Sequence, residues 1–203
     1  MHEEVRSSLA ARAMTEPIDQ KIKWLAEIRK NHAADIGSIA IAWNGLHVVL
    51  GEIFVDVIAP DKKRIVLAAW SAVPNDRSKR AMLESAAVMA FGRKSKFVIE
   101  LKWALGKMNR LEDSRNDAVH TPYAISMGGD EGFQFIPYVW SESPRAKALW
   151  DRDLKLEFAS YLKNIDSITK FARALGKMIH APALDPAWPK RPSLPRPAQA
   201  QVK

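Results

Sequence analysis

The sequence contains no cysteine, which excludes disulfide bonds, thiolate metal sites and a cysteine nucleophile. It also has no His-Glu-x-x-His pattern, no paired-histidine ligand spacing and no glycine-rich phosphate loop. We therefore predict neither a metal nor a cofactor. The first four residues include two glutamates, where a secretory signal would be basic. The most apolar stretch, residues 46–60, is interrupted by His47, Glu52 and Asp56, so we expect it to be too short and too charged to cross a membrane. These absences predict a soluble, cytoplasmic protein with no membrane partner.

The sequence does contain enough apolar side chains for a core. Hydrophobic residues make up 47% of the 203 positions, which excludes general disorder and fits one domain. The net charge of +8 is unevenly distributed: residues 61–110 carry 12 Lys and Arg against 4 Asp and Glu, and residues 181–203 carry 4 against 1. A basic block of this kind attracts polyanions at low specificity, although it equally fits a solvated surface.

Apolar residues recur at helical spacing over most of the chain. Asp35 and either Asn75 or Asp76 are expected to cap helices at their N-termini, and Pro60 is expected to end one. Together these features predict an all-α fold, an antiparallel helical bundle of five to six helices. The expected helices cover about 17–31, 36–59, 62–72, 76–92, 95–111 and 145–179.

Two segments lack the helical pattern. Residues 121–143 contain Pro122 and Pro137, and the alternation around Phe133 and Phe135 predicts a short hairpin-like insertion with its turn near Gly128. The C-terminal stretch holds half of the 12 prolines. We expect residues 1–180 to form a single helical domain and residues 181–203 to form a disordered, flexible, Pro-rich basic tail that packs little.

The segment from Ser114 to His120 has the strongest chemical signal. The planar guanidinium of Arg115 suits two phosphate oxygens, and His120 can donate or accept a proton near neutral pH. Asn116 lies four residues before His120, so the two share a helix face. Ser114 and Asp117 have the spacing of a capping box, which predicts a new helical turn whose open amides favour an anion. A purely structural interpretation is also open, in which Arg115 pairs with a neighbouring carboxylate and His120 caps a helix end.

The run Arg115-Asn116-Asp117-Ala118-Val119-His120 resembles the signature of the HEPN superfamily, in which an arginine and a histidine are separated by four to six residues and the first of these is often polar. The resemblance extends to the layout of an all-helical bundle in which the motif follows a long amphipathic helix. It implies a metal-independent endoribonuclease that works as a homodimer, in which two Arg/His pairs meet between protomers. Some such proteins act as toxins or in defence, with an antitoxin protein as partner, and other members only bind RNA or nucleotides.

The resemblance also implies roles for individual residues. His120 would act on the ribose 2′-hydroxyl or the leaving 5′-oxygen, and Arg115 would stabilise the charge of the transition state. Asn116 would hold a phosphate oxygen or orient Arg115. The toxin branch often has a tyrosine two residues after the histidine, whereas Pro122 stands there in this chain. Tyr123, one residue later, is therefore a secondary candidate.

Three further polar residues are secondary candidates because their helix would line the cleft in the HEPN fold: Asn44, His47 and Glu52. A histidine or glutamate beside an apolar stripe is more often a satisfied core group than a catalytic one. Three functions follow from the sequence: a dimeric ribonuclease, a non-catalytic RNA- or nucleotide-binding module, and an interaction protein whose motif only caps a helix and whose tail recruits partners.

Overall fold

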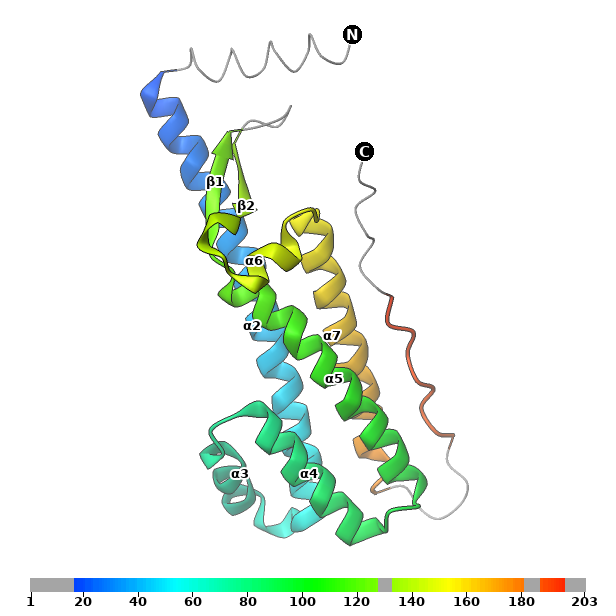
Figure 1. Ribbon diagram of the computed structural model, residues 1–203. Coiled ribbons are helices and arrows are strands. Elements are labelled where there is room, and N and C mark those ends of the chain that lie inside the picture. Colours follow the sequence, from blue (N-terminus) through cyan, green and yellow to red (C-terminus); the bar gives the residue numbers. More distant parts are fainter. Residues whose placement is uncertain (1–16, 128–132, 181–186, 196–203) are drawn as a thin grey trace. The chain divides into compact units, whose positions relative to one another are not determined.

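The structure, a computed structural model, describes residues 17–127, 133–180 and 187–195. Within these residues it contains six α-helices, two short 3-10 turns and one two-stranded sheet, which confirms the all-α prediction (Figure 1). The elements are α2 (Ile18–Ile58), η1 (Pro60–Lys62), α3 (Lys63–Ala72), α4 (Asp76–Phe91), α5 (Lys96–His120), β1 (Tyr123–Met127), β2 (Phe133–Pro137), η2 (Val139–Ser141), α6 (Pro144–Leu149) and α7 (Leu154–Lys177).

The chain divides into two compact units. Of the described residues, unit 1 contains 17–39, 116–127 and 133–158, and unit 2 contains 40–115, 159–180 and 187–195. The three long helices α2, α5 and α7 contribute residues to both units. The expectation of a single domain over residues 1–180 stays a prediction.

Unit 2 is a helical bundle in which α5 runs antiparallel to α2 and α7 (Figure 1). Its core is formed by the apolar stripes that the sequence predicted, and α4 begins where expected, because the side chain of Asn75 accepts a hydrogen bond from the Ser78 amide. Gly92 ends this helix with a φ of 79°, which a side chain would strain. The largest fully buried side chains of unit 2 are Trp43, Leu46, Leu50, Leu83, Leu101, Met108, Ile165, Ile168 and Leu175.

Unit 1 packs the β1–β2 hairpin against the first part of α2. The strands are antiparallel with Ile125 opposite Phe135, as the alternating pattern predicted, while the expected turn at residues 128–132 lies outside the described residues. The ring of His32 stacks on Phe135 with centroids 4.4 Å apart and meets Tyr123 edge-on at the same distance. Burial, partly opposed by Asp35, lowers the pKa of His32, so the packed ring is neutral.

The predicted boundary at Asp35 was wrong, because α2 is one continuous helix of 41 residues. Residues 31–34 contain neither proline nor glycine, and Ala33 and Ala34 are the best helix formers, so the helix propagates through this region. A residue with a capping side chain does not start a new helix unless the preceding helix is interrupted. The end at Ile58, before Pro60, was predicted correctly.

The merged helix also changes the membrane interpretation. Within the part of the chain that the structure describes, α2 is the one helix that is long and apolar enough to cross a bilayer, with mean hydropathy 1.5 over 18 residues. Length and composition alone therefore do not exclude a membrane span, contrary to what the interruptions in residues 46–60 had suggested. The core helix of a soluble protein passes the same criteria, and 56% of the window is buried inside the protein, as such a helix requires.

The expected helix over 145–179 is interrupted between α6 and α7. Asp153 caps the new helix, because its side chain accepts a hydrogen bond from the Leu156 amide at the start of α7. Trp150 lies at the end of α6 and is exposed. The stripe from Phe158 to Leu175 is buried as predicted.

The described part of the proline-rich tail, residues 187–195, forms neither helix nor strand. It nevertheless makes side-chain contacts with unit 2, which its composition did not predict.

Candidate functional site

The motif residues lie at the C-terminal end of α5, which is continuous from Lys96 to His120. The predicted capping box at Ser114 was therefore wrong: nothing between Leu111 and Ser114 breaks the helix, so Ser114 lies inside it and no helix start is available to bind an anion there. In a continuous helix, residues five apart project about 140° from each other, so Arg115 and His120 do not share a face. Asn116 and His120 do share one.

Arg115 belongs to unit 2, where it is half-buried. Its guanidinium carbon lies 6.0 Å from the ring centroid of Trp43, a cation–π distance. Burial alone would raise the pKa of Asp76, but the indole N–H of Trp43 and nearby charges, including Arg115, hold this pKa below its usual value. Arg115 thus contributes positive charge to an internal cluster of unit 2.

His120 belongs to unit 1, where it is the exposed last residue of α5. Asn116 and Asp117 are half-buried on the preceding turn. Nε of Arg145, on α6, lies 3.8 Å from Oδ1 of Asp117. Unit 1 therefore places a second arginine, which the sequence did not single out, beside the turn that precedes His120.

An exposed aromatic segment lies against the same end of α5. The amide of Tyr138 donates a 2.8 Å hydrogen bond to the carbonyl of Pro122, two residues after His120. Tyr138 and Trp140 are 44% and 80% exposed, although side chains of this kind are usually buried. Within unit 1 an exposed imidazole and an arginine thus lie near the end of α5, and the segment that carries two exposed aromatic side chains is hydrogen-bonded to Pro122.

The secondary candidate Tyr123 has a structural contact. Its hydroxyl donates a 3.0 Å hydrogen bond to the carbonyl of Ala118, and its ring packs on His32. The hydroxyl therefore anchors β1 to the last turn of α5.

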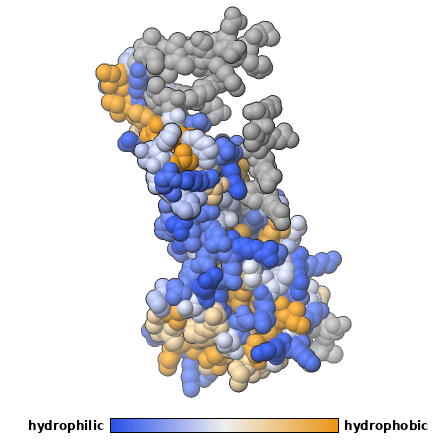
Figure 2. All heavy atoms as spheres, viewed as in Figure 1, coloured by the Kyte–Doolittle hydropathy of each residue, from blue (hydrophilic) through white to orange (hydrophobic). Residues whose placement is uncertain are grey.

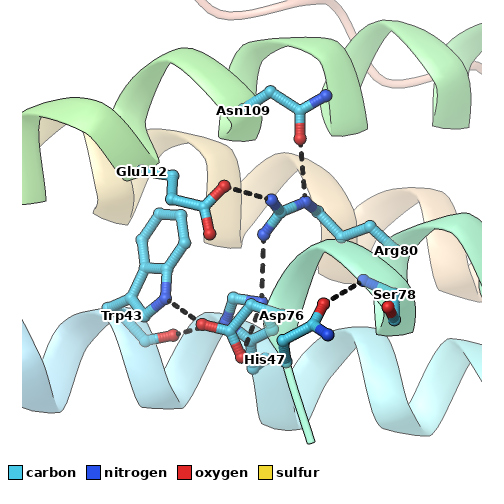
Figure 3. A network of polar contacts seen from close by, with 8 residues as sticks. Trp43, His47, Asp76, Ser78, Arg80, Asn109 and Glu112 are labelled. Carbon is cyan, nitrogen blue, oxygen red and sulfur yellow. Dashed lines mark hydrogen bonds and ion pairs between the residues drawn. The ribbon is translucent and has the colours of Figure 1, made fainter. Parts of the chain in front are cut away.

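Unit 2 contains a second cluster of polar residues, around the secondary candidate His47 (Figure 3). Arg80, only 3% exposed, donates from Nη2 to Glu112 at 2.6 Å and from Nε to Asn109 at 3.0 Å. Its Nη1 lies 3.4 Å from Nε2 of His47. The indole of Trp43 donates to Asp76 at 2.8 Å. We call His47, Asp76, Arg80, Asn109 and Glu112 the unit 2 polar cluster.

The protonation of His47 follows from its neighbours. Nδ1 lies 3.2 Å from the carbonyl of Trp43, which can only accept, so Nδ1 carries the hydrogen. Nε2 lies 3.4 Å from Nη1 of Arg80, which can only donate, and 3.6 Å from Oδ1 of Asp76, which can only accept. Burial is the main cause that lowers the pKa of His47, with Asp76 opposing it. This is the satisfied core histidine that the sequence left as an alternative.

Glu52 and Asn44 are exposed on α2, and neither takes part in the hydrogen bonds of the unit 2 polar cluster. Glu52 lines a groove of about 290 Å³ in unit 2 together with Val49, Ile53, Asp56, Arg173, Gly176, Lys177 and His180. In this groove Nε2 of His180 lies 3.3 Å from Oδ1 of Asp56. Among the described residues, no group of three His, Asp or Glu side chains could hold a metal ion.

Sequence analysis missed Asp76, Arg80, Asn109 and Glu112 as members of a cluster. One signal was present: residues 80, 83 and 87 follow helical spacing, so Arg80 lies on the buried face of α4 with Leu83 and Ala87. An arginine at such a position needs an internal partner. For Arg145 the sequence offers no comparable signal, because its proximity to Asp117 depends on the chain reversal through the hairpin.

Comparisons with protein-family models, curated proteins and solved structures find no match to this chain. The HEPN resemblance therefore rests on residues 115–120 and on the all-α fold.

Proposed function

We propose that this protein binds single-stranded RNA and that the exposed end of α5 in unit 1 contacts it. The observation that carries this proposal is the backbone hydrogen bond from Tyr138 to Pro122, which ties a segment with two exposed aromatic side chains to the residue two positions after His120. Aromatic side chains stack on the bases of single strands, and a nearby arginine, here Arg145, can bind phosphate.

The charge of unit 2 supports the same function. Nine of the 12 basic residues in the segment 61–110 are exposed, and Figure 2 shows hydrophilic side chains over much of the visible surface of α5. Of the 12 basic residues in 61–110, all of which the structure describes, Arg80 and Lys102 form an ion pair with a carboxylate. The remaining positive charge would attract a polyanion at long range, in a salt-dependent way. The exposed members are Lys62, Lys63, Arg64, Arg77, Arg93, Lys94, Lys96, Lys102 and Arg110.

Trp140→Ala tests this proposal directly. Loss of one stacking ring costs about 1–3 kcal/mol, so the affinity for a fluorescent single-stranded RNA, measured by anisotropy, should fall about 5- to 150-fold. Trp150→Ala is the matched control, because Trp150 is also exposed in unit 1 but lies outside the Tyr138–Trp140 segment. Equal affinities of the two variants, or no binding by the parent protein at 50 mM salt, would contradict the proposal.

A second candidate function, cleavage of the bound RNA, is favoured by the exposure of His120. An imidazole that solvent reaches can approach a phosphodiester and transfer a proton, while Asn116 and Arg145, which belong to the same unit, are the candidates for phosphate contact. In the HEPN arrangement a second copy of the chain would complete the site, and an antitoxin protein would block it.

His120→Gln separates cleavage from binding. We expect RNA cleavage in the presence of EDTA to fall about 10²- to 10⁴-fold while RNA affinity changes little, because the substitution removes the proton-transfer group and keeps a polar side chain of similar size. His180→Gln is the control, since His180 is an exposed histidine in unit 2. If His120→Gln cleaves RNA as fast as the parent protein, His120 is not the catalytic residue. If the cleavage rate per chain does not depend on protein concentration, the site is not shared between the protomers of a weak dimer.

A further inference from the structure

The proline-rich segment 187–195 has a repeat of three residues. Pro189, Pro192 and Pro195 recur at this spacing, and Trp188, Arg191 and Leu194 follow the same period one residue earlier. A polyproline-II helix has three residues per turn, so each set forms one edge of such a helix. The segment lies in an extended, non-helical path in unit 2 (Figure 1).

The edge formed by Trp188 and Arg191 contacts a stripe on α5. The Nζ of Lys96 lies 5.0 Å from the ring centroid of Trp188. One turn further along the tail, Arg191 donates two hydrogen bonds to Glu100, at 2.8 and 3.2 Å, and lies 5.3 Å from the ring centroid of Trp103. Lys96, Glu100 and Trp103 have the i, i+4, i+7 spacing of a single helix face.

Two features distinguish these contacts from accidental surface pairs. The Glu100 side chain is only 14% exposed, so its bidentate pair with Arg191 is partly shielded from solvent. Trp103 is held in place from the other side by Phe171, with ring centroids 5.1 Å apart and planes at 70°. Both contacts of Arg191 are therefore made to side chains whose positions are fixed.

The far end of the segment is bound by α7. Asn164 is 5% exposed, and its Nδ2 donates a 3.1 Å hydrogen bond to the carbonyl of Pro195. Its Oδ1 is buried and has no hydrogen-bond partner among the described residues. A buried amide with these contacts stabilises the fold only while the tail occupies this position, because a buried donor without a partner is costly. Lys96, Glu100, Trp103 and Asn164 together form what we call the tail-docking face.

We infer that the tail-docking face is a binding site for a polyproline-II segment with an arginine between two prolines, and that the corresponding segment of a second copy of this chain can replace the chain's own. The order of the contacts, Trp188 with Lys96 and then Arg191 with Glu100 and Trp103, gives the register. The bidentate Arg191–Glu100 pair gives the specificity, and the buried amide of Asn164 marks the end of the site. A second copy carries the same residues in the same order, so exchange between copies preserves every contact and changes only the connection.

The absence of cysteine allows a direct test in the full-length protein. Ser193→Cys places one nitroxide label at an exposed position of the segment, and the electron paramagnetic resonance spectrum reports its mobility. We expect a restricted label in the parent, a mobile label after Arg191→Glu, and a restricted one again when Glu100→Arg is added. Lys190→Glu is the matched control, because it changes the same charge one residue away on an exposed side chain. A label in Arg191→Glu that is no more mobile than in Lys190→Glu would overturn the inference.

Exchange is tested with a fluorescent peptide of residues 186–197. In the parent chain the tethered segment competes at an effective concentration of about millimolar, whereas in the Arg191→Glu chain the site is vacant. The peptide should therefore bind the Arg191→Glu chain at least about tenfold more tightly than the parent. A peptide with the same Arg191→Glu change should not bind the Arg191→Glu chain but should bind a chain that carries Glu100→Arg. Equal affinity for both chains, or equal binding by both peptides, would exclude the exchange.

Discussion

Two histidines of this protein, His47 in unit 2 and His120 in unit 1, have the same types of neighbour and opposite surroundings. His47 is buried, and polar atoms lie close to both of its ring nitrogens. His120 is exposed at the end of a helix, with Arg145 and Asp117 nearby on the same unit. Histidine, arginine and carboxylate therefore form a closed internal cluster in one unit and an open surface in the other. Chemical composition alone does not distinguish the two clusters, whereas solvent access does.

The largest effect should come from breaking the unit 2 polar cluster. Arg80→Met removes the donor for Glu112, Asn109 and His47, and the loss of one partner from a buried ion pair costs about 3–5 kcal/mol. Because Glu112 is partly exposed, we expect the lower end, about 3 kcal/mol, in the free energy of unfolding measured with urea.

Arg145→Met is the matched comparison in unit 1. The Arg145 side chain is 46% exposed and its Nε lies 3.8 Å from Asp117, so the same substitution should change stability by less than about 1 kcal/mol. Adding Glu112→Gln to Arg80→Met should recover part of the loss, because it removes the unpaired carboxylate. Similar costs for the two arginines would show that the unit 2 polar cluster does not hold the fold.

A smaller effect should appear as a dependence of stability on pH. Burial lowers the pKa of His47 from its ordinary value of 6.5, so the folded state favours the neutral ring. This contribution to stability is complete above pH 6.5 and is lost as the pH falls from there toward the lower folded pKa, because the unfolded chain binds the proton first. The free energy of unfolding should therefore decrease between pH 7.5 and 5.5, by at most about 1.4 kcal/mol per pH unit for this group.

His47→Gln should reduce the slope of that decrease. His32 in unit 1 also has a pKa lowered by burial, so part of the slope should remain and disappear only in the double variant with His32→Gln. An unchanged slope in His47→Gln would mean that a charged ring is accommodated in the unit 2 polar cluster.

The fold was largely predictable because it depends on local patterns. Apolar spacing found the helices, Asn75 and Pro60 marked two boundaries correctly, and alternation around Phe135 found the hairpin. The errors share one cause: Asp35 and Ser114 were treated as helix starts although no breaker precedes either of them. At α7 the error was the reverse. Asp153 does cap the start of a helix there, but it was not considered as a helix start.

The candidate sites were less predictable because they depend on contacts between elements far apart in the sequence. His47 was identified as a polar residue beside an apolar stripe, but its partner Arg80 comes from another helix. The aromatic segment near His120 is positioned by a backbone hydrogen bond from Tyr138 to Pro122, for which no side-chain pattern is a signal. The docking of the tail likewise depends on Asn164, whose exposure could not be read from the α7 stripe alone.

The smallest effect on stability is expected at Trp140. This exposed tryptophan of unit 1 can be compared directly with Trp43, a buried tryptophan of unit 2. Removal of a buried tryptophan usually costs 3 kcal/mol or more, and Trp43 is fully buried. Trp140 is 80% exposed, so Trp140→Ser should change the free energy of unfolding by less than about 0.5 kcal/mol. The same variant should weaken RNA binding if the exposed ring stacks on a base. A large loss of stability would show instead that Trp140 packs within unit 1 in solution, which would remove the surface on which the proposed RNA site depends.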